Sequence, residues 1–366
     1  MALPESQKRD SPSPLKLDFT VSKNVGNSTA KEFWSKYRAQ QNKRDGYPVN
    51  AYNYRDVAYH VDVYLGSNGQ KNSVMLDTGS ADLWVPNTGY NPSTSDTSSD
   101  LGEPFSIWYA DGSESQGEYY SDSLSFANGA FVVENFQFAR AGSSTGNFGT
   151  GVLGIADTNQ EASQNTYDNL PYALQSAGIT PKASYSLFLG PKGDSGTIIF
   201  GGIDTEKYTG NLATYNIDTN AGGLAVDIQS VNFNGKDIPV NAPALLDSGT
   251  TLGFLNKKLM NELDVIFKTT ITTLGSSQYR LTSCVQPSDK FLKFNFGANT
   301  ISIPYSEAIG NPVGNGLCYL GFGYNGNQMY LGDVFLRKAY VYYDLTDQTI
   351  SLAQSSYSSA SNIISA

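Results

Sequence analysis

Two short stretches of this sequence share one pattern: VMLDTGS at residues 74–80 and ALLDSGT at residues 244–250. Each is an apolar run that ends in an aspartate, a hydroxyl residue and a glycine. Each aspartate is followed, 77 and 85 residues later, by the glycine of a second short motif, VLG at 152–154 and YLG at 330–332. One Asp-Ser/Thr-Gly tripeptide arises easily in a chain rich in glycine and serine. Two copies with matching surroundings indicate an internal duplication of two similar lobes.

The two aspartates of this repeat, Asp77 and Asp247, are the candidate catalytic residues. A carboxylate at the end of a buried strand faces a low dielectric and needs hydrogen bonds. If two such turns meet between lobes, the carboxylates share one proton, so that one acts as base toward a trapped water and the other as acid toward a carbonyl oxygen. The pattern therefore predicts amide hydrolysis without a metal, a histidine or a covalent intermediate. The alternative is a pair of purely structural aspartate turns.

The composition predicts an all-β protein with few helices. The 366 residues include 36 Gly and 24 Tyr, and only 16% are charged. We expect strands at 59–65, 73–76, 131–138, 197–200 and 340–343, and short helices at 170–177 and 257–267. No run of 18 apolar residues exists, which excludes a membrane-spanning helix of that kind. The single histidine, His60, excludes most zinc catalysis, and no cofactor or metal is expected.

Charge is distributed unevenly along the chain. Residues 1–44 hold nine Lys/Arg and four Asp/Glu, a net charge of +5, which leaves −15 for residues 45–366 of a chain at −10. The basic segment ends in the dibasic pair Lys43-Arg44, and the spacing of its apolar residues predicts a helix over 29–42. We interpret 1–44 as a pro-segment cut after Arg44, the alternative being a plain extension. The acidic body argues against nucleic-acid binding.

Beyond the aspartate repeat, four stretches are similar to the pepsin-like aspartic proteases: DLWVP at 82–86, IWYADGS at 107–113, FGGID at 200–204 and LGDVFLR at 331–337. The resemblance covers essentially all of 45–366. It implies an all-β fold of two β-barrel-like lobes, 45–204 and 205–366, with an active-site cleft between them. It also implies a hydrolase, an aspartic endopeptidase acting at acidic pH and made as a zymogen, most like the secreted or vacuolar proteases of yeasts.

The same resemblance assigns roles residue by residue. Asp77 and Asp247 become the catalytic pair, Thr78 and Ser248 brace the two loops, and Ser80 and Thr250 hydrogen-bond the outer carboxylate oxygens. The flap and the substrate-binding positions are Tyr109, Ala110, Asp111, Gly79, Gly249, Thr251 and Trp84. Ala110 stands where the family usually has glycine, which places a methyl group at the flap tip.

The two cysteines, Cys284 and Cys318, fit either one disulfide or two buried thiols, and the resemblance favours the family's second-lobe disulfide. The implied partners are protein or peptide substrates bound extended in the cleft, the chain's own pro-segment as inhibitor, and pepstatin-type inhibitors. We expect a monomer that binds no nucleic acid and no membrane. The expected location is extracellular, or alternatively vacuolar. No signal peptide is visible at the start, so a secreted protein would already have lost its signal.

The sequence leaves two rival functions open. One is a catalytically inactive pepsin-fold binding or inhibitor protein, although both aspartate motifs and Tyr109 are intact. The other is serine catalysis at Ser195 of GDSG, residues 193–196, with His60 as base. His60 lies in an alternating strand pattern, and the G-x-S-x-G at 142–146 has no histidine after it. The serine-rich tail, 355–366, is expected to be mobile or to lie at an edge.

Overall fold

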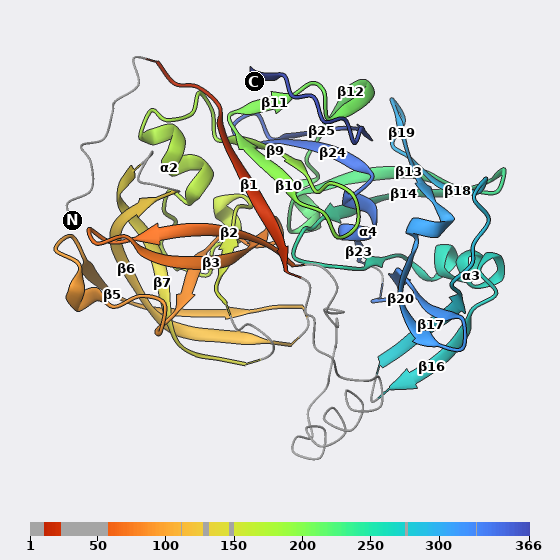
Figure 1. Ribbon diagram of the computed structural model, residues 1–366, viewed down its shortest axis with the longest axis horizontal. Helices are drawn as coiled ribbons and strands as arrows, with labels where there is room; N and C mark the ends of the chain where they lie inside the picture. Colours follow the sequence, from red (N-terminus) through yellow and green to blue (C-terminus); the bar gives the residue numbers. More distant parts are fainter. Residues whose placement is uncertain are drawn as a thin grey trace.

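The computed structural model describes residues 11–22, 58–110, 112–126, 132–145, 150–274, 277–326 and 328–366 (Figure 1). Strands dominate, which confirms the all-β expectation. The helices are short: α2 (Leu170–Ser176), α3 (Lys257–Ile266) and α4 (Asp333–Leu336). Within the described ranges, no helix is long and apolar enough to cross a membrane. The helix expected at 29–42 and the pair Lys43-Arg44 fall outside these ranges.

The largest sheet has thirteen strands and runs through most of the molecule. Its order is β12-β25-β24-β9-β10-β1-β2-β3-β8-β4-β7-β6-β5, so the first and last thirds of the chain meet in it. The strands are β1 (Leu15–Ser22), β2 (Ala58–Leu65), β3 (Gln70–Asp77), β4 (Leu83–Pro86), β5 (Ser99–Trp108), β6 (Glu114–Ser125), β7 (Val132–Ser144), β8 (Val152–Gly154), β9 (Ser184–Phe188), β10 (Gly196–Phe200), β12 (Tyr208–Asn216), β24 (Ala339–Asp344) and β25 (Thr349–Ser355).

Strand β1 comes from the basic N-terminal segment and lies inside this sheet. Figure 1 shows it between β2 and β10, and the register pairs Phe19 with Gly196 on one side and Val21 with Tyr59 on the other. The Phe19 ring is buried against Tyr59, with their centroids 5.1 Å apart. Leu15 is buried as well. This segment therefore contributes to the core and is not only a charged extension.

The second half of the chain forms its own sheet of seven strands, in the order β19-β18-β13-β14-β23-β15-β22. A four-stranded sheet, β16-β17-β21-β20, lies beside it (Figure 1). The strands are β13 (Ala225–Phe233), β14 (Lys236–Leu246), β15 (Gly253–Phe254), β16 (Thr270–Leu274), β17 (Ser277–Ser283), β18 (Phe291–Asn295), β19 (Thr300–Pro304), β20 (Ile309–Gly314), β21 (Leu317–Leu320), β22 (Phe322–Gly323) and β23 (Met329–Leu331).

The repeated sequence motif gives the same strand arrangement twice. In the first half, β3 runs parallel to β8, which pairs Asp77 with Gly154, and β4 is antiparallel to β8. In the second half, β14 runs parallel to β23, and β15 is antiparallel to β23. The VLG and YLG stretches are thus the central strand of each unit. This agreement supports the expected duplication of two similar lobes.

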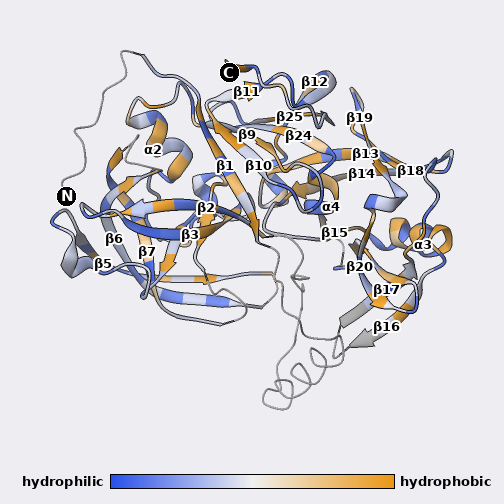
Figure 2. Cartoon of the chain, in the orientation of Figure 1, coloured by the Kyte–Doolittle hydropathy of each residue, from blue (hydrophilic) through white to orange (hydrophobic). Residues whose placement is uncertain are grey.

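Buried apolar side chains from both halves merge into one large cluster, and Figure 2 shows hydrophobic residues on α2 and along the strands of the central sheet. A smaller cluster lies apart from it around Trp84, with Phe105, Ile107 and Tyr119. Tyr109 and Tyr167 pack against this smaller cluster while remaining partly exposed. It therefore supports the hairpin formed by β5 and β6.

The serine-rich tail is held in place along its length. Its last strand, β26 (Ile363–Ser365), pairs with β11 (Gly202–Asp204). The buried carboxyl of Asp204 accepts hydrogen bonds from Asn362 N at 2.8 Å and Ser361 Oγ at 2.6 Å. Of the two alternatives, a mobile or an edge terminus, the pairing agrees with the edge position.

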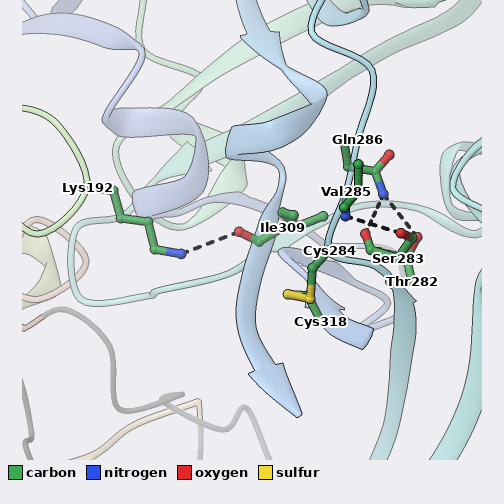
Figure 3. The surroundings of a disulfide bond; sticks show 8 residues. All are labelled: Lys192, Thr282, Ser283, Cys284, Val285, Gln286, Ile309 and Cys318. Carbon is green, nitrogen blue, oxygen red and sulfur yellow. Dashed lines mark hydrogen bonds between the residues drawn. A yellow bond between two sulfur atoms is a disulfide. The ribbon is translucent and has the colours of Figure 1, made fainter. Parts of the chain in front are cut away.

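The Cys284–Cys318 disulfide is present in the second half, which confirms that prediction. The Cα atoms are 5.0 Å apart, and Cys318 lies on β21 opposite Thr282 of β17. Figure 3 shows the bond beside β20, where Lys192 Nζ from the first half lies 3.5 Å from Ile309 O. The two cysteines are bonded to each other, so the alternative of two buried thiols is wrong.

Candidate active site

The two aspartates of the repeat lie at corresponding strand ends. Asp77 is the last residue of β3, and Asp247 directly follows β14. Each strand ends in buried apolar residues, so each carboxyl lies in the interior. The exposed fraction is 5% for Asp77 and 8% for Asp247. The backbone N–H of Asp247 donates to Leu331 O at 3.2 Å, and Asp77 O accepts from Ile155 N at 3.0 Å. Both aspartates are therefore fixed by the VLG and YLG strands of their own half.

Each carboxyl accepts the same two hydrogen bonds. Asp77 Oδ1 accepts from Gly79 N at 2.8 Å, and Asp77 Oδ2 accepts from Ser80 Oγ at 2.5 Å. Asp247 Oδ1 accepts from Gly249 N at 2.8 Å, and Asp247 Oδ2 accepts from Thr250 Oγ1 at 2.6 Å. The turns therefore supply one backbone donor and one hydroxyl donor to each buried carboxyl.

The two aspartate loops are tied to each other by a reciprocal set of bonds. Thr78 N donates to Ser248 Oγ at 3.1 Å, and Ser248 N donates to Thr78 Oγ1 at 2.9 Å. Each hydroxyl then donates across the interface, Thr78 Oγ1 to Leu246 O at 2.8 Å and Ser248 Oγ to Leu76 O at 3.1 Å. These bonds hold the halves of the site in one fixed relation.

The glycines of the two loops are needed because the carboxyls are so close. A Cβ on Gly79 would lie 2.7 Å from Asp247 Oδ1, and a Cβ on Gly249 would overlap Asp77 Oδ1. Each glycine therefore touches the aspartate of the opposite half. The two carboxyls face each other across these glycines, which is the arrangement that the repeat predicts.

The electrostatics of the pair follow from this burial. Burial first, and then the neighbouring charge of Asp247, raise the pKa of Asp77 to about 7, while the bonds from Ser80 and Gly79 act in the opposite direction. A carboxyl with so high a pKa keeps a proton across the acid range. The arrangement can therefore hold one proton between two carboxyls, which is what a combined acid and base needs.

A hairpin built from β5 and β6 brings Tyr109 close to the Asp77 loop. Tyr109 follows β5, and its turn is closed by Tyr109 N to Ser113 O and Gly112 N to Tyr109 O, both at 2.9 Å. The Tyr109 hydroxyl accepts from Trp84 Nε1 at 2.7 Å. Burial and then the charge of Asp77 raise the pKa of Tyr109, so the phenol stays neutral next to the site. The hydroxyl group is thus aligned by a buried indole.

The other residues predicted for the hairpin, the substrate contacts and the serine alternative lie as follows. Ala110 is exposed at the turn, and Asp111 lies outside the described residues. Thr251 is partly buried, and its carbonyl accepts from Val334 N at 3.3 Å. His60 lies in β2 with Nε2 3.3 Å from Thr150 Oγ1, and no bond to Ser195 occurs among the described residues. The serine alternative therefore receives no support from geometry.

Two buried aspartates near the site were not assigned roles by sequence reasoning. Asp82 Oδ1 accepts from Tyr119 at 2.7 Å and Tyr167 at 2.8 Å, and Asp82 Oδ2 accepts from Ala162 N at 2.8 Å. Asp333 is almost completely buried, and burial raises its pKa well above the usual range. Asp82 lies in the DLWVP stretch and Asp333 in the LGDVFLR stretch. An aspartate among apolar neighbours is the sequence signal that could have identified each of them as buried.

The comparisons with known proteins agree with this geometry. The family model described as "Eukaryotic aspartyl protease" matches residues 58–355. Candidapepsin of Candida tropicalis is 36% identical over 384 residues, which cover 99% of this chain and 93% of that protein. Secreted aspartic protease 1 of Candida albicans is 37% identical over 98% of this chain and 94% of its own length. An aspartic proteinase from Irpex lacteus has the same fold, with a TM-score of 0.73, 21% identity, and coverage of 83% of this chain and 96% of that one.

Proposed function

The chain belongs to the eukaryotic aspartyl protease family and is an aspartic endopeptidase, and on that premise we propose that Asp77 and Asp247 are its catalytic pair. The observation that carries this proposal is the matched environment of the two carboxyls. Each accepts one backbone and one hydroxyl hydrogen bond, and each lies against the glycine of the other loop. A pair of structural turns would not need so close an approach.

The proposed reaction uses one water and the shared proton of the pair. The ionised carboxyl takes a proton from the water as its oxygen attacks the peptide carbonyl carbon, and the protonated carboxyl gives its proton to the carbonyl oxygen. The resulting tetrahedral diol then breaks its C–N bond as the leaving nitrogen is protonated by the pair. We assign the two proton roles to the pair and not to either residue, because coupled groups titrate together.

The surroundings have supporting roles in this proposal. Thr78 and Ser248 keep the carboxyls at a fixed separation, and Ser80 and Thr250 hold their outer oxygens. Tyr109 closes over the bound peptide with Trp84 behind it. The substrate lies extended, with backbone hydrogen bonds from Gly79, Asp111, Gly249 and Thr251.

The zymogen interpretation is supported by the position of β1. The proposed pro-segment, 1–44, contains a strand paired on both edges to the proposed N-terminal lobe, 45–204. Its net charge of +5 complements the −15 of the body, so the two attract at neutral pH. In this interpretation a lysine of the segment pairs with the catalytic carboxylates. The candidates are Lys36 and Lys43, which lie outside the described residues.

The expected location follows from the relatives, which are named secreted aspartic proteases. We infer an extracellular enzyme, and the disulfide agrees with an oxidising compartment. Delivery to a vacuole remains the alternative. In either location the enzyme would meet protein substrates, and the proposed hydrolysis requires no cofactor.

We expect the acid-treated full chain to hydrolyse protein substrates and to lose this activity with a pepstatin-type inhibitor, because the inhibitor would occupy the cleft at the aspartate pair. The measurement is peptide release from a denatured protein at acidic pH, with a serine-protease inhibitor as the matched control. Binding to immobilised inhibitor without any hydrolysis would instead identify the inactive pepsin-fold binding protein of the alternative.

Acidification should also remove the pro-segment. Protonation of body carboxylates, around pH 4, removes the attraction to the basic segment, so cutting after Arg44 leaves Asp45 as the new N-terminus. N-terminal sequencing of the product, after acid and after a dibasic-specific protease, measures this. A full-length chain that is fully active at neutral pH, or an active form that keeps residues 1–44, would contradict the zymogen proposal.

A further inference from the structure

The buried carboxyl of Asp82 receives three hydrogen bonds from residues that lie far along the chain. Its Oδ1 accepts from the hydroxyl groups of Tyr119 on β6 at 2.7 Å and Tyr167 at 2.8 Å, and its Oδ2 accepts from Ala162 N at 2.8 Å. Asp82 is completely buried, and within the described residues no cation acts on it. These neutral donors are therefore what stabilises the carboxyl in the interior, and it in turn holds them in place.

The backbone of Asp82 is fixed next to the first aspartate of the pair. Asp82 O accepts from Gly154 N at 3.0 Å, and Gly154 is the residue opposite Asp77 in the register of β3 and β8. A Cβ on Gly154 would lie 2.6 Å from Asp82 N, so the two backbones touch at this point. The position of Asp82 relative to Asp77 is thus set by the sheet.

The tyrosines that donate to Asp82 lie in the same apolar cluster that supports Tyr109. Tyr119 belongs to the small cluster around Trp84, and Tyr109 and Tyr167 both pack against that cluster. The rings of Tyr119 and Tyr167 meet edge to face, with their centroids 6.0 Å apart. Strand β6, which carries Tyr119, returns from the turn that follows Tyr109 and lies between β5 and β7 (Figure 1). Asp82 therefore anchors the side chains on which Tyr109 rests.

We propose that Asp82 is a positioning residue for the reaction: it fixes Tyr119 and the loop 161–167, and through them the place of Tyr109 beside the aspartate pair. Asp82 itself touches no reacting atom in this scheme. Its loss lowers the fraction of chains in which Tyr109 is correctly placed, and kcat/KM falls with that fraction. This inference rests on the proposed function, because the kinetic effect requires Tyr109 to close over the peptide.

The test compares Asp82→Ala in the natural chain and in the Tyr109→Ala background. Alanine removes every acceptor, so both tyrosine hydroxyls and the Ala162 N–H lose their partner. We expect kcat/KM for a peptide in acid to fall at least about tenfold in the natural chain. The fall should be less than about twofold in Tyr109→Ala, because that background has no Tyr109 to misplace.

More conservative variants separate positioning from a loss of folding. Asp82→Asn keeps an oxygen that accepts from both tyrosine hydroxyls, so it should restore most of the lost kcat/KM. Tyr119→Phe and Tyr167→Phe each remove one donor, and each should cause a smaller loss that disappears in Tyr109→Ala. These two variants decide the question if Asp82→Ala does not fold.

Asp122 is the matched control, because it is a buried carboxyl on β6 that also accepts from a tyrosine. Its Oδ2 accepts from the Tyr90 hydroxyl at 2.6 Å and its Oδ1 from Ser123 N at 2.8 Å. Tyr90 belongs to the large apolar cluster and not to the one around Trp84. Asp122→Ala should lower the melting temperature and leave kcat/KM within about twofold of the natural value.

A second measurement needs no substrate. The indole N–H of Trp84 donates to the Tyr109 hydroxyl, so its NMR chemical shift reports whether Tyr109 is in place. In Asp82→Ala the shift should move toward its value in Tyr109→Phe, which lacks the acceptor, and in Asp122→Ala it should stay at the natural value. The signal is assigned by its absence in Trp84→Phe.

Equal losses of kcat/KM in the natural chain and in Tyr109→Ala would overturn the positioning role, as would an unchanged indole shift in Asp82→Ala. An equal loss in Asp122→Ala would show that any buried carboxyl of this half has the same effect, which also contradicts the inference. A natural chain that cuts no peptide would overturn the proposed function, and the indole shift then tests the placement of Tyr109 by itself.

Discussion

Replacement of either Asp77 or Asp247 by Asn is expected to lower kcat by about 10³-fold or more, with the fold intact. Asparagine keeps the size of the side chain but can neither hold the shared proton nor accept one, so both proton transfers of the proposed reaction fail. Gly79 N and Ser80 Oγ can still donate to an amide oxygen, which preserves the loop. The measurement is single-turnover cleavage of a peptide in acid, alongside the melting temperature.

The chain offers a matched control for this experiment. Asp194 is followed by Ser195 and Gly196, so it carries a third Asp-Ser-Gly tripeptide, but it is exposed and its Oδ1 accepts from Ser195 N at 2.8 Å. Asp194→Asn should leave kcat unchanged. Near-normal activity in either Asp77→Asn or Asp247→Asn would show that the pair is the wrong site.

The pH profile of the natural chain adds a second readout of the same pair. Burial and the charge of Asp247 raise the pKa of Asp77 to about 7, so the shared proton is present below that pH and is lost as the pH rises through it. Activity should therefore fall on the alkaline side as the pH approaches 7. Folding stability from this carboxyl has the same sign: its contribution is present below the unfolded pKa, near 3.9, and is lost as pH rises through 7.

Tyr109→Ala should reduce kcat/KM by about 10²-fold, because the ring that excludes water and aligns the peptide is lost. Tyr109→Phe keeps the ring and removes only the oxygen that accepts from Trp84 Nε1, so it should have a smaller effect. Trp108 is the matched control, since it lies one residue earlier on the same hairpin but is 69% exposed. Unchanged kinetics in Tyr109→Ala, or an equal loss in Trp108→Ala, would show that this hairpin does not act as the flap.

The sequence predicted those parts of the site whose signal is local. The apolar run, the aspartate, the hydroxyl and the glycine are adjacent in the chain, and each has a physical task in one tight turn. The strands expected at 59–65 and 197–200 and the helices expected at 170–177 and 257–267 were also located to within a few residues. These segments combine a clear period with turn residues at both ends.

Strand β1 was missed although its pattern is clear. Leu15, Leu17, Phe19 and Val21 alternate with polar residues, and in the structure Leu15 and Phe19 are buried whereas Lys16 and Asp18 are exposed. Because residues 1–44 were interpreted from their net charge, this alternation of apolar and polar residues was not recognised as a strand. Such alternation indicates a strand whatever the net charge of the surrounding segment.

Other features could not be predicted because their partners are distant in the chain. The tail is held by Asp204, more than 150 residues before Ser361. Gln160 meets Gly79 and Gly222 only after both halves have folded. Asp82 is buried because Tyr119 and Tyr167 arrive from separate strands and loops. No local pattern identifies contacts of this kind.

The strand order of the central sheet has a consequence for how the chain reaches this structure. Strand β1 pairs with β10, and β9 pairs with β24, so residues near the beginning, middle and end must all be present before the sheet can close. Closing such long loops is entropically costly, and folds dominated by distant pairings form slowly. Synthesis on the ribosome must be nearly complete before the sheet assembles, and refolding from denaturant should be slow and should compete with aggregation through unpaired strand edges.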